Sequence, residues 1–201
     1  MLYTGAGDTG TTKVLNSKPG TRVSKSSCQT EALGALDELN SFLGLLKVKL
    51  SEVEWTVPGT IPVKVPGRSE GKTEKEKPAD VIHWVQNCLF IAQAKAAGSD
   101  KHIDEKHTKA MEYMIDHIEQ EMPPIKTFFI SGGSELAALS DICRTLARKA
   151  ERRVIAGQEQ GSVAMNISTL QFLNRLSSLL YAISRYVNWL GHAKEQAPWY
   201  D

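Results

Sequence analysis

The sequence predicts an all-α protein, a five-helix bundle preceded by a polar N-terminal loop. Five segments repeat apolar residues at the 3.6-residue period of helices packed on one side: 28–50, 79–98, 101–121, 131–157 and 167–192. Their connections are mostly short, as in bundles. We therefore expect a helical domain over 28–192, a polar loop over 1–27 and a C-terminal tail over 193–201.

Size and charge limit the classes of partner. The 201 residues can bury a core, and 41% hydrophobic and 23% charged residues are ordinary for a soluble globular protein. A net charge of +1 argues against a general nucleic-acid or membrane-surface binder. No apolar run has the length of a membrane span, and the N-terminus lacks a signal or transit pattern, so the expected location is cytoplasmic.

The three cysteines, Cys28, Cys88 and Cys143, are far apart and form no CxxC pair. This usage predicts buried thiols in a reducing compartment, rather than a disulfide framework or a zinc site.

The loop over 1–27 is rich in Gly, Thr, Ser and Lys. Gly5, Gly7 and Gly10 satisfy GxGxxG, but no strand precedes them and no apolar helix follows, which excludes a dinucleotide fold. Thr11 stands where a Walker A lysine is required. What remains is a segment dense in backbone N–H groups and hydroxyls, which either wraps phosphates or forms a disordered tail.

The helix predicted over 28–50 buries an apolar face and carries Asp37 and Ser41 one turn apart on its polar side. A carboxylate at the margin of a packed surface favours a cationic partner, and the three arginines described below are the candidates. The alternative is an exposed aspartate with no role. Residues 51–78 then contain four prolines, three glycines and alternating Lys and Glu, which predicts a long flexible loop, with a short hairpin around Val57 to Val65.

The next two helices, over 79–98 and 101–121, carry two acid–histidine pairs with i, i+3 spacing, Asp80 with His83 and Asp104 with His107. The spacing resembles the Glu-x-x-His element of di-iron bundles, but the bridging glutamates have no counterpart, so capping and solvated side chains are favoured over a metal site. Ile125 to Ile130 is then predicted to be extended, and the adjacent Phe128 and Phe129 should point to opposite sides.

The helix within 131–157 is the most informative segment. Ser134 is the predicted N-cap and Gly157 the predicted C-terminal stop. One face is apolar, and beside it the guanidinium groups of Arg144, Arg148 and Arg152 follow one flank at i, i+4 and i+8. Like charges at this spacing disfavour an isolated helix by about 0.2–0.5 kcal/mol per pair, which a polyanion or carboxylates from other helices would offset. A solvated flank is the alternative.

The last predicted helix has a leucine-rich seam and a polar cluster of Asn174, Arg175 and Ser178 near its start, and the aromatic tail could dock on a neighbouring copy.

Four separated stretches resemble one family, in order and at matching separations. They are YTGAGDTGTT from residue 3, ALDELNSFLG from residue 35, FFISGGSELAALSDICRTLARKAERRV from residue 128 and LQFLNRLSSLLYAISRYVN from residue 170. The chain resembles the ATP:cob(I)alamin adenosyltransferases of the propanediol-utilisation type. The resemblance implies a trimer of five-helix bundles, with ATP, Mg²⁺ and cobalamin at subunit interfaces. It also implies transfer of the 5′-deoxyadenosyl group to cobalt with release of triphosphate.

The resemblance also implies site residues. Those expected to bind ATP are Thr4, Gly5, Ala6, Gly7, Asp8, Thr12, Lys13, Lys25, Arg148, Glu151, Arg152 and Asn174, the last also lying near the corrinoid. Arg144 is expected to pair across the interface with Asp37, and Phe128 to displace the lower axial ligand of cob(II)alamin. The resemblance assigns no metal ligands. A corrinoid reductase and an adenosylcobalamin-dependent enzyme are the expected partners.

Some residues depart from the family pattern. Gly5 stands where many members have a lysine, Ser26-Ser27-Cys28 replaces an acidic pair and a proline, Ser131 replaces a proline and Ser178 an aspartate. Because that lysine is missing, a non-catalytic carrier or regulator that binds ATP or corrinoid is an alternative function. A helical scaffold whose charged flanks only join subunits is a further alternative.

Overall fold

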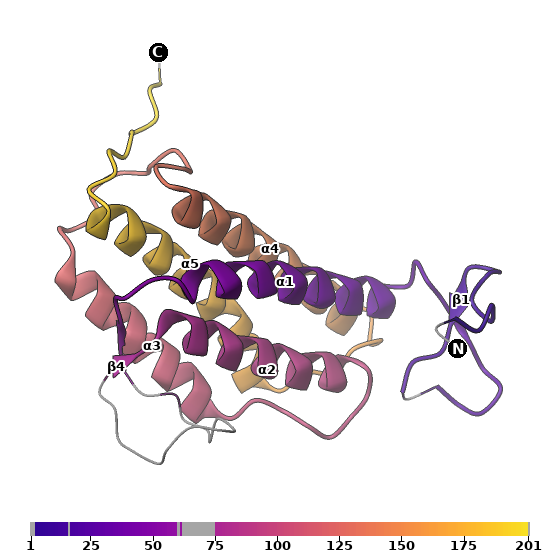
Figure 1. Ribbon diagram of the computed structural model, residues 1–201. Coiled ribbons are helices and arrows are strands. Elements are labelled where there is room, and N and C mark those ends of the chain that lie inside the picture. The colour runs from indigo at the N-terminus through magenta and orange to yellow at the C-terminus, as the bar shows by residue number, and fades with distance from the viewer. Residues whose placement is uncertain (1–2, 16, 60, 62–74, 201) are drawn as a thin grey trace.

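The computed structural model describes residues 3–15, 17–59, 61 and 75–200. Within them the chain forms five helices (Figure 1): α1 (Cys28–Leu50), α2 (Pro78–Ala96), α3 (Glu105–Glu121), α4 (Glu135–Glu159) and α5 (Ile167–Leu190). The predicted all-α class and the number of helices are confirmed. The largest shift at a helix start is in α3, which begins at Glu105 rather than near residue 101.

The helices pack in the spatial order α2, α1, α4, α5, α3. Trp84 of α2 is fully buried between the two ends of this series, where it meets the ring of Phe172 of α5 edge-on at 5.9 Å and stacks on His107 of α3 at 6.3 Å. Leu36, Leu39 and Leu43 of α1 have no exposed surface. Burying a side chain of this size contributes roughly 1.5–3 kcal/mol, so this core holds the polar faces of α4 and α5 in place.

In the part of the chain that the structure describes, two short antiparallel strand pairs accompany the bundle. Strand β1 (Thr11–Thr12) pairs with β2 (Val23–Ser24), and β3 (Val57–Pro58) pairs with β4 (Lys75–Glu76). Most of the hairpin predicted around Val57 to Val65 lies outside the described residues; the part that is described, β3, pairs with β4, beyond that range. Residues 60 and 62–74 lie outside the described residues, so the predicted flexibility of 51–78 stays a prediction.

Helix α4 begins as predicted and ends later. The Ser134 side chain accepts a hydrogen bond from the backbone N–H of Ala137 at 3.2 Å, which confirms the N-cap. Gly157 is not the stop, because the helix continues to Glu159. This glycine is buried, and a Cβ there would lie 2.7 Å from Cγ2 of Val163 and 3.6 Å from the backbone oxygen of Cys28. Its lack of a side chain serves close packing, not helix termination.

Candidate active site

The polar N-terminal segment forms a small lobe around β1 and β2, beyond the N-terminal end of α1 (Figure 1). Backbone hydrogen bonds within the lobe hold its shape. The N–H of Asp8 donates to the carbonyl of Gly5 at 3.1 Å, and the N–H of Lys25 donates to the carbonyl of Gly10 at 2.9 Å. Gly5 and Gly10 have φ of +67° and +77°, values that glycine adopts readily. The segment is therefore arranged as a loop with its amides and hydroxyls at the surface.

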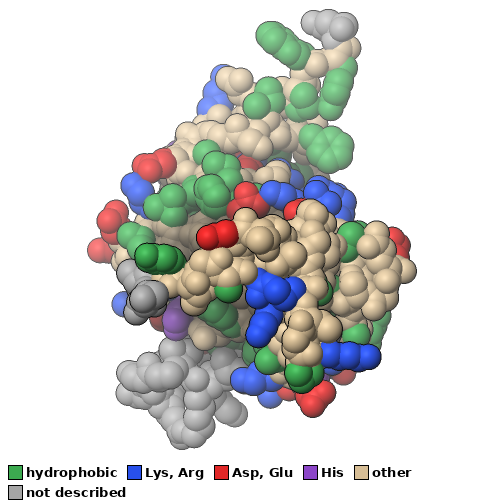
Figure 2. Space-filling view, turned by 90° about the vertical axis from the view of Figure 1, so that its right-hand side faces the viewer, with side chains coloured by type: hydrophobic (Ala, Val, Ile, Leu, Met, Phe, Trp, Pro, Cys, Tyr) green, Lys and Arg blue, Asp and Glu red, His purple; other side chains and the backbone are tan. Residues whose placement is uncertain are grey.

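The lobe brings together all the ATP-binding residues predicted before the first helix. Each is exposed or half-buried: Thr4, Gly5, Ala6, Gly7, Asp8, Thr12, Lys13 and Lys25. A Cβ at Gly7 would lie 3.0 Å from Nζ of Lys25, so the ammonium group sits directly over the glycine backbone. Figure 2 views the molecule from this end and shows Lys and Arg side chains distributed among polar surface, not gathered in one patch.

The arginine strip on α4 has two members that make no ion pair within the described residues. Arg148 and Arg152 are exposed, while Lys149 and Arg153 on the same helix pair with Glu38 and Glu31 of α1. The guanidinium groups of Arg148 and Arg152 are therefore available to bind a polyanion in bidentate fashion.

Glu151 and Asn174 are brought together by a polar chain that crosses three helices. The Asn174 amide donates to Oε1 of Glu151 at 2.8 Å, and Arg175 donates to Oδ1 of Asn174 at 2.9 Å. Arg175 in turn pairs with Glu112 of α3 at 2.8 Å. These contacts fix the orientation of the Asn174 amide and join the predicted polar cluster of α5 to the strip on α4.

Asp37 is not paired with any of the arginines that the structure describes. It is exposed, and within the described residues its carboxylate forms no ion pair. Arg144 instead donates through Nε to Asp141, one turn earlier on α4, at 2.8 Å, and lies over the ring of Tyr181. The carboxylates of α1 that do pair with α4 are Glu31 and Glu38. Its pairing with Arg144 of another copy stays a prediction.

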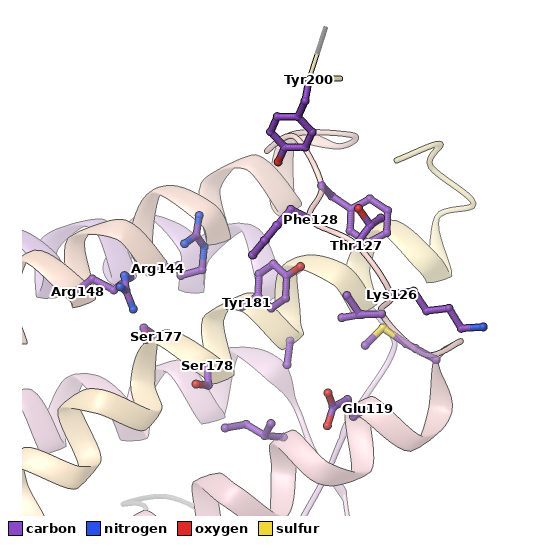
Figure 3. A pocket seen from close by; sticks show the side chains of 15 residues that line it. Glu119, Lys126, Thr127, Phe128, Arg144, Arg148, Ser177, Ser178, Tyr181 and Tyr200 are labelled. Atoms are coloured by element: carbon purple, nitrogen blue, oxygen red, sulfur yellow. The ribbon is translucent and has the colours of Figure 1, made fainter. Parts of the chain in front are cut away.

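A cavity of about 1050 Å³ lies where α3, α4, α5 and the 122–129 segment meet (Figure 3). Arg144 and Arg148 reach it from α4, Ser178 and Tyr181 from α5, and Phe128 from the connecting segment. Its remaining lining is largely apolar and aromatic, with Glu119 and Lys126 as charged members: Ile115, Glu119, Met122, Ile125, Lys126, Thr127, Phe129, Ser177, Ala182 and Tyr200. A basic edge and an aromatic wall thus share one cavity.

The two adjacent phenylalanines point to opposite sides, as predicted. The Phe128 side chain is 78% exposed at the cavity, whereas Phe129 is half-buried with its ring 5.4 Å from the Arg185 guanidinium. Because alternate residues of an extended segment face opposite ways, packing of Phe129 presents Phe128 to the cavity.

Two further residues of α5 belong to the site and were not predicted from the sequence, Tyr181 and Arg185. Tyr181 lines the cavity, and Arg185 lies behind it, 5.3 Å from the Tyr181 ring. With Asn174 and Ser178 they recur at i, i+4, i+7 and i+11, which is one helix face. That periodicity was the signal that could have found them.

No cysteine or histidine of the described residues lines the cavity. Burial raises the pKa of Cys88 and of Cys143 to about 12, so neither forms a thiolate near neutral pH, while Cys28 is half-buried. No cluster of three His, Cys, Asp or Glu suited to a metal occurs in the described part of the chain. None of the described helices is both long and apolar enough to span a bilayer.

Comparison with known proteins agrees with this arrangement. Residues 2–187 match the family model described as cobalamin adenosyltransferase. The corrinoid adenosyltransferase of Bacillus subtilis is 34% identical over 187 residues, which cover 93% of this chain and 86% of that protein. The corrinoid adenosyltransferase PduO of Citrobacter freundii is 32% identical over 92% of this chain, and the match spans about half, 49%, of its length.

Solved structures show the same fold. A variant of a PduO-type ATP:corrinoid adenosyltransferase from Lactobacillus reuteri, complexed with cobalamin and ATP, superposes with a TM-score of 0.77 at 25% identity. The match covers 98% of this chain and 96% of that one. A second variant of that enzyme, complexed with ATP, has a TM-score of 0.76. The matched family model spans nearly the whole chain, and this protein belongs to the cobalamin adenosyltransferase family.

Proposed function

We propose that this protein transfers the 5′-deoxyadenosyl group of ATP to cob(I)alamin, giving adenosylcobalamin and triphosphate. The observation that carries the proposal is the shared cavity, in which Arg144 and Arg148 lie at one edge and Phe128 and Tyr181 form an aromatic wall. The guanidinium of Arg148, which makes no ion pair within the described residues, suits a triphosphate, and a large, mostly apolar cavity suits a corrin ring.

In this reaction cobalt attacks C5′ of ATP, the cobalt–carbon bond forms, and the C5′–oxygen bond breaks with its electrons leaving on triphosphate. No general base is required, because the metal of the substrate is the nucleophile. The protein contributes placement of C5′ and stabilisation of the leaving charge. Arg148 and Arg152, with Lys25 and the amides of the N-terminal lobe, are the groups that would neutralise triphosphate.

Mg²⁺ fits this site as an ion held mainly by phosphate oxygens. Mg²⁺ keeps several waters and needs one or two protein carboxylates at most, and the described residues contain no larger metal-ligating cluster. Asp8 in the lobe and Glu151 on α4 are the carboxylates among the proposed ATP ligands. The ion would share the neutralisation of the leaving group.

Phe128 is proposed to control cobalt ligation. It is exposed at the cavity on a segment anchored from behind by Phe129. An aromatic ring at the lower face of the corrin would exclude the axial ligand of cob(II)alamin. A cobalt without that ligand is reduced more readily to the nucleophilic Co(I) state.

The complete site is proposed to form between copies in a trimer. The N-terminal lobe and the segment that carries Phe128 lie at opposite ends of one bundle (Figure 1), so one chain does not unite them. Arg144 donates to Asp141 through Nε. The terminal N–H groups of Arg144 can therefore donate to a carboxylate of the next copy, such as Asp37. Phe42, Leu45 and Val48 give α1 an exposed apolar face that a neighbouring copy could cover.

The decisive experiment is an anaerobic assay with ATP, Mg²⁺ and chemically reduced cobalamin, following loss of cob(I)alamin absorbance. A photolabile alkylcobalamin with stoichiometric triphosphate is the expected product. Arg148→Ala should lose about 10²–10³ in turnover while melting like the wild type, because its side chain makes no ion pair with any residue that the structure describes. Arg153→Ala, on the same helix but paired with Glu31, is the matched control and should retain turnover.

A carrier or regulator of the same fold is the second candidate, favoured by Gly5 at a position where many members have lysine. ATP binding without triphosphate release in the same assay would support it and overturn the transferase. A cytoplasmic location, a corrinoid reductase that supplies cob(I)alamin and an enzyme that accepts the product complete the proposal.

A further inference from the structure

The segment that carries Phe128 is held by the chain that follows α5. After Leu190 the backbone reverses at His192, which has φ of 51°, and the N–H of Ala193 donates back to the carbonyl of Asn188 at 2.9 Å. The chain then runs beside residues 125–133, where the N–H of Ile130 donates to the carbonyl of Gln196 at 2.8 Å. We call residues 193–196 the C-terminal strap.

Asn188 ties the strap to the start of α4. Its side chain is 1% exposed, and its amide donates to the carbonyl of Gly132 at 2.8 Å and to Oε1 of Glu195 at 2.9 Å. Its Oδ1 accepts from the hydroxyl of Ser134 at 3.0 Å. A Cβ at Gly133 would lie 2.6 Å from this amide, so backbone and side chain are in close contact.

Arg185 is the charged counterpart of Asn188, one turn earlier on α5. It is 3% exposed, and it contacts Asp141 at 3.3 Å and Glu195 at 2.5 Å. The contact with Glu195 is an ion pair whose N–H is poorly aligned with the oxygen, so its attraction is mainly Coulombic. The same guanidinium lies over the ring of Phe129, the neighbour of Phe128.

The charges of this cluster balance only when Glu195 is included. Asp141 serves both Arg144 and Arg185, so two arginines share one buried carboxylate and Glu195 supplies the second negative charge. A buried charge without its partner is strongly unfavourable. The ion pair of Arg185 with Glu195 therefore holds the strap against α5, in addition to the hydrogen bonds that Ala193 and Glu195 make with Asn188.

We propose that Arg185 and Glu195 are positioning residues for the corrinoid: their ion pair clamps the C-terminal strap and the 125–133 segment to α5 and thereby fixes Phe128 as a wall of the cavity. The proposal rests on the proposed function. Arg185 lies against the ring of Phe129, and the strap is hydrogen-bonded to the same segment at Ile130, so loosening either contact moves Phe128. Tyr200, beyond the strap, lines the same cavity (Figure 3).

Glu195→Gln tests the clamp, because it removes the charge and keeps the shape. Gln196→Ala is the matched control on the same segment, since residue 196 contributes its backbone carbonyl to the contact with Ile130. Hydrogen exchange of peptides covering 125–133 should become faster, by about tenfold or more, in Glu195→Gln and stay at the wild-type rate in Gln196→Ala. Exchange in α1 and α2 should be the same in all three proteins.

The kinetic readout separates positioning from general stability. Glu195→Gln should raise KM for the corrinoid and slow turnover from cob(II)alamin under reductant by roughly 10- to 100-fold, with KM for ATP unchanged. Turnover from preformed cob(I)alamin should fall less, and Glu195→Asp, which keeps the charge, should recover part of the loss.

Three results would overturn parts of the reasoning separately. Unchanged exchange over 125–133 in Glu195→Gln would refute the clamp itself. Faster exchange with unchanged corrinoid kinetics would refute the positioning role. If the wild type showed no turnover, the proposed function would be refuted. Exchange rates, together with equilibrium binding of hydroxocobalamin to both variants, would still show whether the ion pair clamps the segment.

Discussion

Replacing Gly157 with alanine tests whether close packing governs this position. At an ordinary helix-interior position the substitution stabilises by roughly 0.8–1.0 kcal/mol, because alanine is the better helix former. Here the added Cβ would lie 2.7 Å from Cγ2 and 3.2 Å from Cβ of Val163. Carbon atoms prefer a separation of about 3.5–4.0 Å, so rotation of the valine side chain alone would not remove the contact.

Val163 is not free to retreat. Its own N–H and that of Ser162 both donate to the carbonyl of Gly157, at 3.1 and 2.9 Å, and the valine is 5% exposed. Overpacking of this kind costs about 1–3 kcal/mol. Subtracting the gain in helix propensity, we expect Gly157→Ala to destabilise by about 1 kcal/mol, a loss of roughly 2–4 °C in melting temperature at this chain length.

The assay is thermal unfolding at one fixed protein concentration, because oligomerisation would make the melting temperature depend on concentration. Val163→Ala alone should destabilise by about 1–3 kcal/mol through lost burial. In that background the same Gly157→Ala change should become neutral or stabilising, since the obstructing methyl groups are gone. A stabilising effect of Gly157→Ala in the wild-type background would refute the argument, because helix propensity would then outweigh the contact.

Three further predictions concern the interface, the cavity and pH. Asp37→Ala should weaken association of the subunits, measured by sedimentation at low concentration, because it removes the carboxylate proposed for the terminal N–H groups of Arg144; an unchanged oligomer would count against the pairing. Phe128→Ala should slow reaction with cob(II)alamin under reductant more than reaction with preformed cob(I)alamin, and equal losses would contradict its role at the lower face. Burial lowers the pKa of His107 beneath 6.5, so the folded state disfavours its protonation. Stability should therefore fall as pH drops below about 6.5 and level off beneath the lowered folded-state pKa, a decline that His107→Gln should reduce in chemical denaturation.

The sequence alone determined the helices because each one buries a face whose apolar spacing is local information. The stripe through Leu139, Cys143 and Val154 predicted α4, and the Ser134 cap was read from the same segment. The opposite orientation of Phe128 and Phe129 followed equally from two adjacent residues in an extended chain. In each case the cause lies within a few residues of the effect.

The tertiary structure decided which partner each polar group meets. Asp141 lies one turn before Arg144 on α4, but only the packing of α5 on α4 brings Arg185 to the same carboxylate. The folded bundle likewise leaves Asp37 of α1 at the surface. Gly157 was misjudged for the same reason, since Val163 approaches it through a loop whose path no local pattern specifies. The clamp of Arg185 and Glu195 likewise depends on a reversal after α5 that juxtaposes the strap with the 125–133 segment. Periodicity fixes the face on which a side chain lies, whereas its partner depends on the free energy of packing all five helices together.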